Sequence, residues 1–133
     1  VNHLKMLSVF IENKPKRLSK IIEELSKEKI SISGLAIADA GDFGIVRLIV
    51  NDAAKGASIL SKHEMIANIQ EVIGVNIDIS TVSEIAKILG ENNVNIEDAL
   101  GFAFLNNEKI LVLKVDNNEL ATKILSKEGL KIY

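Results

Sequence analysis

The chain has 133 residues, with 16 Lys and Arg against 18 Asp and Glu, a formal net charge of −2, 4% aromatic residues and no Cys. The near balance of charge and the scarcity of aromatic rings argue against a nucleic-acid surface, and the absence of Cys excludes disulfides and thiolate chemistry. No apolar run approaches the roughly 18 residues of a membrane span and no signal-peptide pattern opens the chain, so we expect a cytoplasmic protein that binds neither nucleic acid nor membrane.

The first half of the chain is predicted to run strand, helix, strand, strand, helix, strand. The strands are expected at residues 4–11, 30–38, 43–50 and 65–72. The first helix opens at Lys14-Pro15, because Pro suits the first helical position, and it carries apolar residues at helical spacing. A turn at residues 39–42 separates the two middle strands. Asp52 is expected to cap a second helix that runs to about Lys62.

The second half is predicted to repeat this order of elements. Its strands are expected at residues 73–79, 94–105, 108–115 and 130–133. Capping-box patterns for its two helices lie at Thr81 with Glu84 and at Asp116 with Glu119. Asn106-Asn107 is expected to form a tight turn, since Asn tolerates a positive φ. Gly129 is expected to end the last helix.

The two halves also repeat one another in sequence. The tetrapeptide Ile59-Leu60-Ser61-Lys62 recurs unchanged as Ile124-Leu125-Ser126-Lys127, an offset of 65 residues. At the same offset the apolar positions Val46, Leu48 and Val50 fall on Leu111, Leu113 and Val115. Self-similarity at a fixed period indicates a duplicated structural unit. We therefore predict two modules, residues 1–71 and residues 72–133.

Strand-helix-strand-strand-helix-strand is the order of a ferredoxin-like βαββαβ module. We predict an α+β fold made of two such modules, each an antiparallel sheet with its helices on one face. Residues 4–11 carry apolar side chains on both faces of the predicted strand, and such a strand needs cover on both sides. We expect the face of the sheet away from the helices to be covered by the sister module or by a second chain in a homodimer.

Several segments resemble the ACT-domain family. Glu12-Asn13-Lys14-Pro15-Lys16-Arg17-Leu18 resembles the family signature, in which an Asn or Asp, a Pro and a Gly precede a Leu on the helix. Ile30-Ser31-Ile32 and Val94-Asn95-Ile96 are similar to the Ile-Asn-Ile or Val-Asn-Ile that ACT domains commonly carry there. Residues 37–50 resemble the corresponding stretch of stand-alone tandem ACT proteins, some of them labelled amino-acid-binding or acetolactate-synthase-like. The resemblance covers essentially the whole chain.

The resemblance implies a ligand site where the first loop of one ACT module meets the sheet of a neighbour. The candidate ligand-binding residues are Asn13, Lys14, Pro15, Lys16, Arg17, Leu18, Ser31, Asp39 and Asn95. Within this set the Asn13 amide suits an ammonium or a carboxylate, Arg17 suits a carboxylate and Asp39 suits an ammonium group. Backbone N–H groups at a helix N-terminus also favour a carboxylate.

Two departures from the family pattern bear on this site. Lys16 stands where the family has Gly, the residue that permits a close backbone approach and a positive φ. The corresponding loop of the second module, residues 77–81, has neither Pro nor Gly. We therefore expect one kind of site, formed by the first module. Ile11, Leu35 and Ile37 are candidates for lining its depth.

The candidate residues also have structural interpretations, which the sequence leaves open. Asn13 suits a helix cap or its entry turn, and Asp39 suits the turn in which it lies. Ser31 and Asn95 suit the polar edge of a strand. The charged side chains of the loop suit a solvated helix start.

No pattern in the sequence indicates catalysis, a cofactor or a metal site. His3 and His63 fall in no nucleophile or metal motif, and no Gly-rich phosphate loop is present. Acyl-phosphate enzymes of this fold carry an Arg in the first loop and an Asn on a strand, but Arg17 and Asn95 lie in different modules. We predict a regulatory or sensor protein, not an enzyme, that binds a small molecule, an amino acid in the simplest case, at a module or subunit interface. The alternatives are a small regulatory subunit of a partner enzyme such as acetolactate synthase, and an assembly module without a ligand.

Overall fold

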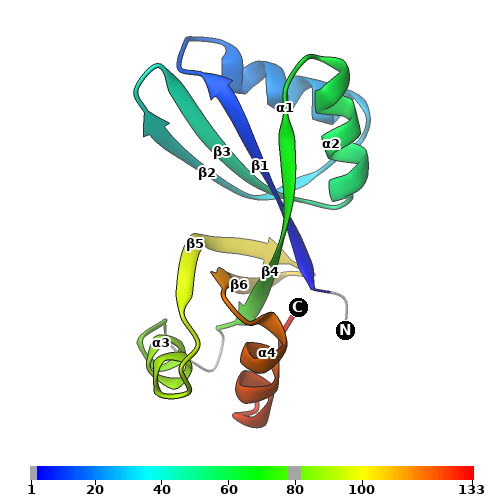
Figure 1. Cartoon of the computed structure of the whole chain (residues 1–133). Helices are drawn as coiled ribbons and strands as arrows, with labels where there is room; N and C mark the ends of the chain where they lie inside the picture. The colour runs from blue at the N-terminus through cyan, green and yellow to red at the C-terminus, as the bar shows by residue number, and fades with distance from the viewer. Residues whose placement is uncertain (1–2, 78–81) are drawn as a thin grey trace. The chain divides into compact units, whose positions relative to one another are not determined.

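The computed structural model describes residues 3–77 and 82–133, which form two compact units (Figure 1). The first unit is Lys5–Gln70, and the second unit is Glu71–Tyr133 together with the N-terminal residues up to Leu4. The strands are β1 (Leu4–Glu12), β2 (Ile32–Ala40), β3 (Phe43–Val50), β4 (Ala67–Asn76), β5 (Ile96–Leu105) and β6 (Glu108–Val115). The helices are α1 (Arg17–Lys27), α2 (Ala53–Lys62), α3 (Val82–Glu91) and α4 (Asn118–Lys127).

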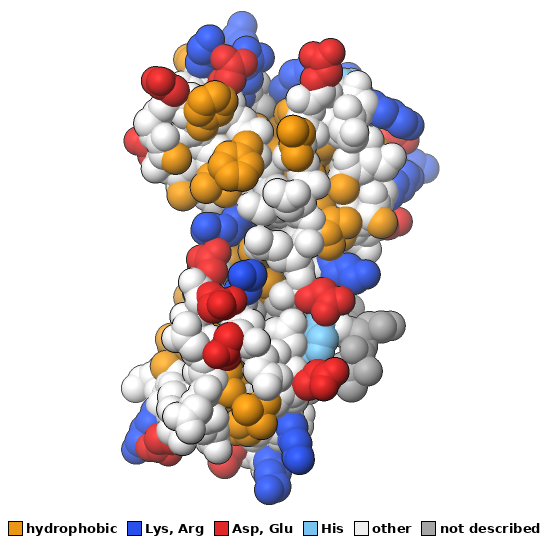
Figure 2. Space-filling view, viewed as in Figure 1, with side chains coloured by type: hydrophobic (Ala, Val, Ile, Leu, Met, Phe, Trp, Pro, Cys, Tyr) orange, Lys and Arg blue, Asp and Glu red, His pale blue; other side chains and the backbone are white. Residues whose placement is uncertain are grey.

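Charged side chains of both signs are interspersed on the face of the molecule that Figure 2 shows, and hydrophobic side chains gather in several places on it. This mixture agrees with the small net charge of the sequence. None of the helices in the described part of the chain combines the length and the apolar character that crossing a membrane requires.

The first unit has the strand order of a ferredoxin-like module. Its strands lie in the order β2-β3-β1-β4. β1 pairs antiparallel with β3, from Met6 opposite Ile49 to Glu12 opposite Phe43. β2 pairs antiparallel with the other edge of β3. Because α1 follows β1 and α2 follows β3 along the chain, the unit has the βαββαβ order that the sequence predicts.

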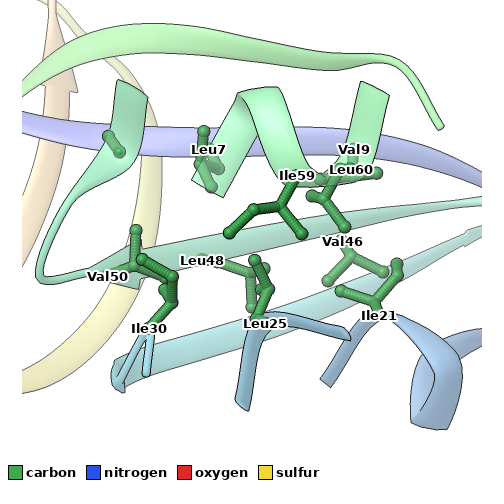
Figure 3. Close-up of a cluster of buried hydrophobic side chains, with 11 residues drawn as sticks. Leu7, Val9, Ile21, Leu25, Ile30, Val46, Leu48, Val50, Ile59 and Leu60 are labelled. Atoms are coloured by element: carbon green, nitrogen blue, oxygen red, sulfur yellow. The ribbon is translucent and has the colours of Figure 1, made fainter. Parts of the chain in front are cut away.

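The core of the first unit lies between one face of the sheet and the helices α1 and α2 (Figure 3). Alternate residues of β1 and β3 point into it, because successive side chains of a strand point to opposite faces. The buried core residues are Leu7, Val9, Ile21, Leu25, Ile30, Val46, Leu48, Val50, Ala53, Ile59 and Leu60. Burying each large side chain of this kind stabilises the fold by about 1.5–3 kcal/mol, which holds both helices on this face of the sheet.

The opposite face of the same sheet is buried at one end and exposed at the other. Met6 and Ile49, which are partners in the β1–β3 register, are 1% and 0% exposed. Phe10 and Phe43, further along the same face, are 52% and 54% exposed. Cover of this face by the sister module or by a second chain stays a prediction.

Each helix is followed by a residue in the left-handed conformation, which turns the chain back toward the core. These residues are Lys29, Glu64, Asn93 and Gly129, with φ of 61°, 62°, 60° and 81°. The apolar residue after each one donates its N–H to a carbonyl in the last turn of the helix: Ile30 to Leu25, Met65 to Leu60, Val94 to Leu89 and Leu130 to Leu125. This arrangement satisfies helix-end carbonyls and buries an apolar side chain. The prediction that Gly129 ends the last helix is confirmed.

The start of α1 differs from the sequence prediction. Pro15 is not the first helical residue, because α1 begins at Arg17 and Lys16 is its N-cap. Lys16 has a φ of 73°, a left-handed conformation that separates Pro15 from the helix. Pro15 instead lies in the turn between β1 and α1.

The two strands predicted at residues 65–72 and 73–79 are wrong as separate elements. The described residues form one strand, β4, which runs through the division between the units at Gln70 and Glu71. Val72 and Ile73, at the predicted break, are both fully buried. The segment contains no Pro and no pair of turn-forming residues that would interrupt a strand, and Gly74 is accommodated within it. Residues 78–79 lie outside the described residues.

The second unit repeats the plan of the first. Its strands lie in the order β5-β6-β4, and Ile132 forms an antiparallel bridge with Val75 on the other edge of β4. The buried core residues are Ile73, Val75, Ile85, Leu89, Val94, Leu111, Leu113, Val115, Ala121, Leu125 and Leu130. The α+β architecture of two ferredoxin-like modules is thus confirmed.

The turns and caps of the second unit confirm one prediction and correct another. Asn106 and Asn107 have φ of 51° and 64°, so they form the predicted tight turn between β5 and β6. Asp116 is not the N-cap of α4, because the side chain of Asn117 accepts the N–H of Leu120 at 3.0 Å. In the first unit Asp52 caps α2 as predicted. The other capping box cannot be compared, since Thr81 lies outside the described residues.

Candidate functional site

The loop between β1 and α1 is fastened to the turn between β2 and β3 by Asn13. Its backbone N–H donates to the carbonyl of Asp42 at 2.9 Å. Its side-chain Nδ2 donates to Asp39 Oδ1 at 3.0 Å and to the carbonyl of Gly41 at 2.9 Å. Asp39 Oδ1 also accepts the N–H of Gly41 at 3.0 Å. The structure therefore brings together two of the predicted site residues that are 26 positions apart in the chain.

Lys16 adopts a backbone conformation that glycine favours. Its φ is 73°, and a residue with a Cβ usually avoids the left-handed region at a cost of about 1–2 kcal/mol. The carbonyl of Lys16 accepts the N–H of Lys20 at 3.1 Å and the hydroxyl of Ser19 at 3.0 Å. The loop thus makes a left-handed turn at the position where the family pattern has Gly.

Two of the basic residues of the loop are paired with the end of β1. Glu12 Oε2 lies 3.0 Å from Lys14 Nζ, and Glu12 Oε1 lies 3.1 Å from an Arg17 guanidinium nitrogen. The hydrogen bond and charge of Lys14, followed by the charge of Arg17, lower the pKa of Glu12. All three side chains are exposed, so the pairs contribute little to stability. Arg17 has further guanidinium donors beyond the one used here.

A cavity of about 470 Å³ opens beside this loop within the first unit. It is lined by Phe10, Ile11, Glu12, Arg17, Lys20, Phe43, His63, Glu64, Met65 and Ile66. Of the predicted site residues only Arg17 lines it, and Ile11 is the one predicted wall residue that does. Leu35 and Ile37 are not part of its lining; they are 44% and 53% exposed on the edge strand β2. We refer to this cavity as the first-unit pocket.

The polar wall of the pocket includes the end of α2. His63 Nε2 lies 2.8 Å from Glu24 Oε2, and Glu24 Oε1 lies 3.2 Å from Lys27 Nζ. The hydrogen bond from Lys27 and the nearby charge of His63 lower the pKa of Glu24. These contacts join the α2–β4 loop to α1, and His63 also lines the pocket.

Sequence reasoning missed most of the pocket because its walls come from segments far apart in the chain. The sequence predicts that a strand begins at Met65, whereas β4 begins at Ala67 and leaves Met65 and Ile66 in the loop before it. The side chains of Phe10 and Phe43 meet this region through the β1–β3 register, in which Phe43 is opposite Glu12. The sequence signal for this part of the pocket was the apolar character of Phe10, Phe43, Met65 and Ile66.

Ser31 and Asn95 have equivalent backbone roles in the two units. The N–H of Ser31 donates to Asn51 Oδ1 at 3.0 Å, and the N–H of Asn51 donates back to the carbonyl of Ser31 at 3.2 Å. The same reciprocal pair joins Asn95 and Asp116, at 3.0 and 3.1 Å. Both arrangements fasten the start of an edge strand to the end of its neighbour.

The structure does not bring Ser31 and Asn13 together within the first unit. Ser31 bonds to the residue after the end of β3, whereas Asn13 bonds to the residue before its start. An eight-residue strand spans roughly 25 Å at about 3.3 Å per residue. Asn95 belongs to the second unit. Leu18, the last of the predicted residues, is partly buried against the core of the first unit.

The second unit has a charged network at the place that corresponds to the pocket. Glu108 accepts hydrogen bonds from Asn76 and from the hydroxyl of Tyr133, and it lies 2.6 Å from Lys131 Nζ. The hydrogen bond from Lys131, and then that from Tyr133, lower the pKa of Glu108. The same contact with Glu108 raises the pKa of Lys131. Among residues 3–77 and 82–133 no group of three or more His, Cys, Asp and Glu is placed to hold a metal ion.

Comparisons with known proteins agree on the architecture. A family model described as an ACT domain pair matches residues 2–132. The crystal structure of protein BT0572 from Bacteroides thetaiotaomicron is 30% identical, with a TM-score of 0.87 over 99% of this chain and 92% of that chain. The ligand-free regulatory subunit of aspartate kinase from Thermus thermophilus is 13% identical, with a TM-score of 0.64 over 96% of this chain and 93% of that chain. Comparison with curated protein sequences gives no significant match.

Proposed function

Because the chain belongs to the ACT domain pair family, we propose that it is a regulatory protein that binds an amino acid and is not an enzyme. The observation that carries this proposal is the first-unit pocket, which opens beside the β1–α1 loop. A concave site of this size is typical of small-molecule binding, and the lining combines apolar side chains with charged ones. The cationic side chains of Arg17 and Lys20 in its wall suit the carboxylate of an amino acid.

The proposed binding residues divide into two groups. Asn13, Lys14, Pro15, Lys16, Arg17, Leu18 and Asp39 belong to the first-unit loop or contact it, and we propose that they shape one side of the site. Ser31 and Asn95 stand apart from this loop. We propose that they contribute only where a neighbouring module or chain completes the site, which is the arrangement that the family resemblance implies.

The proposed mechanism is a shift between arrangements of modules. A ligand shifts such an equilibrium by no more than the difference between its affinities for the two states. We propose that the chain forms a homodimer in the cytoplasm and passes this shift to a partner protein. The division into modules at residues 71 and 72 is part of the same proposal.

Two alternatives concern the partner and the ligand. In one, the chain is a small regulatory subunit of an amino-acid biosynthetic enzyme such as acetolactate synthase. In the other, it is an assembly module without a ligand. The position of β2 at the edge of the sheet favours a role in association, because a strand edge is a surface for pairing.

A thermal-shift screen of the full chain against the twenty amino acids tests the proposal. A ligand present at 100 times its Kd stabilises a protein by about 2.7 kcal/mol, which shifts the melting temperature by several degrees. Arg17→Gln should weaken the response, whereas Lys87→Gln, which removes an exposed charge on α3, should not. No shift with any amino acid would contradict the proposal and favour the assembly module.

A further inference from the structure

The two units differ sharply at three equivalent positions on the sheet face away from the helices. The core residues Leu7, Val9 and Ile11 correspond to Ile73, Val75 and Ile77, and Met65 and Ala67 correspond to Leu130 and Ile132. β3 and β6 correspond along their whole lengths, from Phe43 and Glu108 onward. By these matches Phe10, Phe43 and Ile66 of the first unit stand where the second unit has Asn76, Glu108 and Lys131.

In the second unit these positions are polar and satisfy one another. Asn76 is only 7% exposed, and Asn76, Lys131 and Tyr133 all bond to Glu108. A mutually bonded polar cluster of this kind leaves no apolar wall for a ligand. The first unit has instead three large apolar side chains with substantial exposure.

The apolar side chains of the first unit are not scattered surface residues. Phe10, Phe43 and Ile66 are 52%, 54% and 73% exposed, and all three line the same cavity. Figure 2 shows hydrophobic side chains gathered on the visible surface of this unit. A group of exposed apolar side chains in a concave site is usually a binding surface. Met65 and Ile11 extend this apolar wall inward.

The pocket lining also contains charged side chains. Arg17 and Lys20 lie on the first turns of α1, Glu12 lies 3.1 Å from Arg17, and Glu64 is a further lining residue. A cationic pair suits a carboxylate, and carboxylates suit an ammonium group. The pocket lining therefore contains groups for both charges of an α-amino acid together with an apolar surface.

We infer that the first-unit pocket selects an α-amino acid with a large apolar side chain, which packs against Phe10, Phe43 and Ile66. The carboxylate faces Arg17 and Lys20, and the ammonium group faces Glu12. Within residues 3–77 and 82–133 we infer such a pocket in the first unit and not in the second, because the charged network around Glu108 occupies the corresponding place there. This inference rests on the proposed function and adds the class of amino acid.

Isothermal titration calorimetry on the full chain tests the inference. Leucine, isoleucine, valine, methionine and phenylalanine are compared with serine, aspartate and lysine. The variants Phe43→Glu and Ile66→Lys give the first unit the residues found at the equivalent positions of the second. Phe104→Glu is the control, because Phe104 is 62% exposed on β5 of the second unit.

We expect the apolar amino acids to bind at least tenfold more tightly than the polar ones. Phe43→Glu and Ile66→Lys should each weaken that binding about tenfold or more, since each removes an apolar contact of the size that a buried side chain makes. Phe104→Glu should leave it unchanged. Ile66 lies outside β4, so Ile66→Lys still tests the effect of the pocket on affinity if Phe43→Glu disturbs the sheet.

The outcomes separate this inference from the proposed function. Preferential binding of a polar amino acid, or full binding by both pocket variants, would overturn the inference and leave amino-acid binding in place. If none of the eight amino acids binds the wild-type chain, the inference is overturned. If a different amino acid then binds in the thermal-shift screen, the proposed function stands. If no amino acid binds in either experiment, the proposed function is overturned too.

Discussion

The side chain of Asn13 donates a hydrogen bond to the carboxylate of Asp39, with Nδ2 and Oδ1 3.0 Å apart. Together with the bond from the same nitrogen to the carbonyl of Gly41, it joins the β1–α1 loop to the β2–β3 turn. The family resemblance marks Asn13 as a ligand contact, and the structure gives it a second role as a fastener of the loop.

Replacing Asn13 by Ala should destabilise the first unit modestly. The change removes both side-chain hydrogen bonds at an exposed site, so we expect a loss of about 1 kcal/mol in the free energy of unfolding. Urea denaturation followed by circular dichroism measures this loss. Asn68→Ala, at an exposed position of β4, is the control and should be neutral. Equal stability of the two variants would show that the fastening is energetically unimportant.

Replacing Lys16 by Gly should stabilise the protein by up to about 1 kcal/mol. Glycine adopts a φ near 73° without the steric cost that Lys16 bears, although it also loses more chain entropy on folding. Glu23→Gly on the exposed side of α1 has no such benefit and should destabilise by about 1 kcal/mol. The midpoints of urea unfolding compare the two variants. A lower midpoint for Lys16→Gly would mean that the lysine side chain stabilises the turn.

The network around Glu108 should make stability depend on pH. The pKa of Glu108 is held below its ordinary value of 4.5, first by the hydrogen bond from Lys131 and then by that from Tyr133. A carboxyl group with a lowered pKa stabilises the fold above its unfolded pKa, and this contribution is lost as the pH falls through the lowered value. Wild-type stability should therefore decline as the pH falls below about 4.5.

The variant Glu108→Gln tests this dependence, because it cannot titrate. It should be less stable than the wild type at neutral pH and should lose less stability on acidification. Glu91→Gln, which alters a carboxylate 4.0 Å from Lys87 on α3, should follow the wild-type profile. Thermal melts at neutral pH and below pH 4.5 supply the comparison. Parallel profiles for the wild type and Glu108→Gln would contradict the prediction.

Shortening a side chain in the core of the first unit should lower the free energy of unfolding far more than a surface substitution does. Leu25 is fully buried between α1 and the sheet, so Leu25→Ala should lower the free energy of unfolding by about 2–5 kcal/mol. Leu89→Ala at the equivalent position of the second unit should have an effect in the same range. Leu120→Ala, on the exposed side of α4, is the control. A cost under 1 kcal/mol for Leu25→Ala would mean that the core collapses around the smaller residue.

The fold was predictable where the sequence pattern is local. The bounds of β3 and β6 agree with their predicted ranges, because alternating apolar residues flanked by turn-forming residues define a strand without tertiary information. The turn at Asn106 and Asn107 was predictable for a similar reason, since few residues besides Gly and Asn adopt two successive positive φ angles. The start of α1 was not, because a Lys residue does not by itself indicate the left-handed conformation that Lys16 adopts; the Gly of the family pattern at this position was the one signal for it.

The candidate site was predictable only in part. The family signature located the loop, and the structure joins its Asn13 to Asp39. The pocket beside it depends on which strand lies next to which and on how far the α2–β4 loop extends, so Phe43, His63 and Ile66 entered only with the structure. The choice between Asp116 and Asn117 as a cap was equally hidden, because both residues suit that role.

The passage of β4 through both units has a consequence for how this gene can change. A strand alternates its faces residue by residue, so a single inserted or deleted codon within Ala67–Gln70 would reverse the faces of everything from Glu71 to Asn76. Ile73 and Val75 would then leave the core of the second unit. Because the join between the units lies inside β4, we expect length variation among related chains at the surface turns and not at the join.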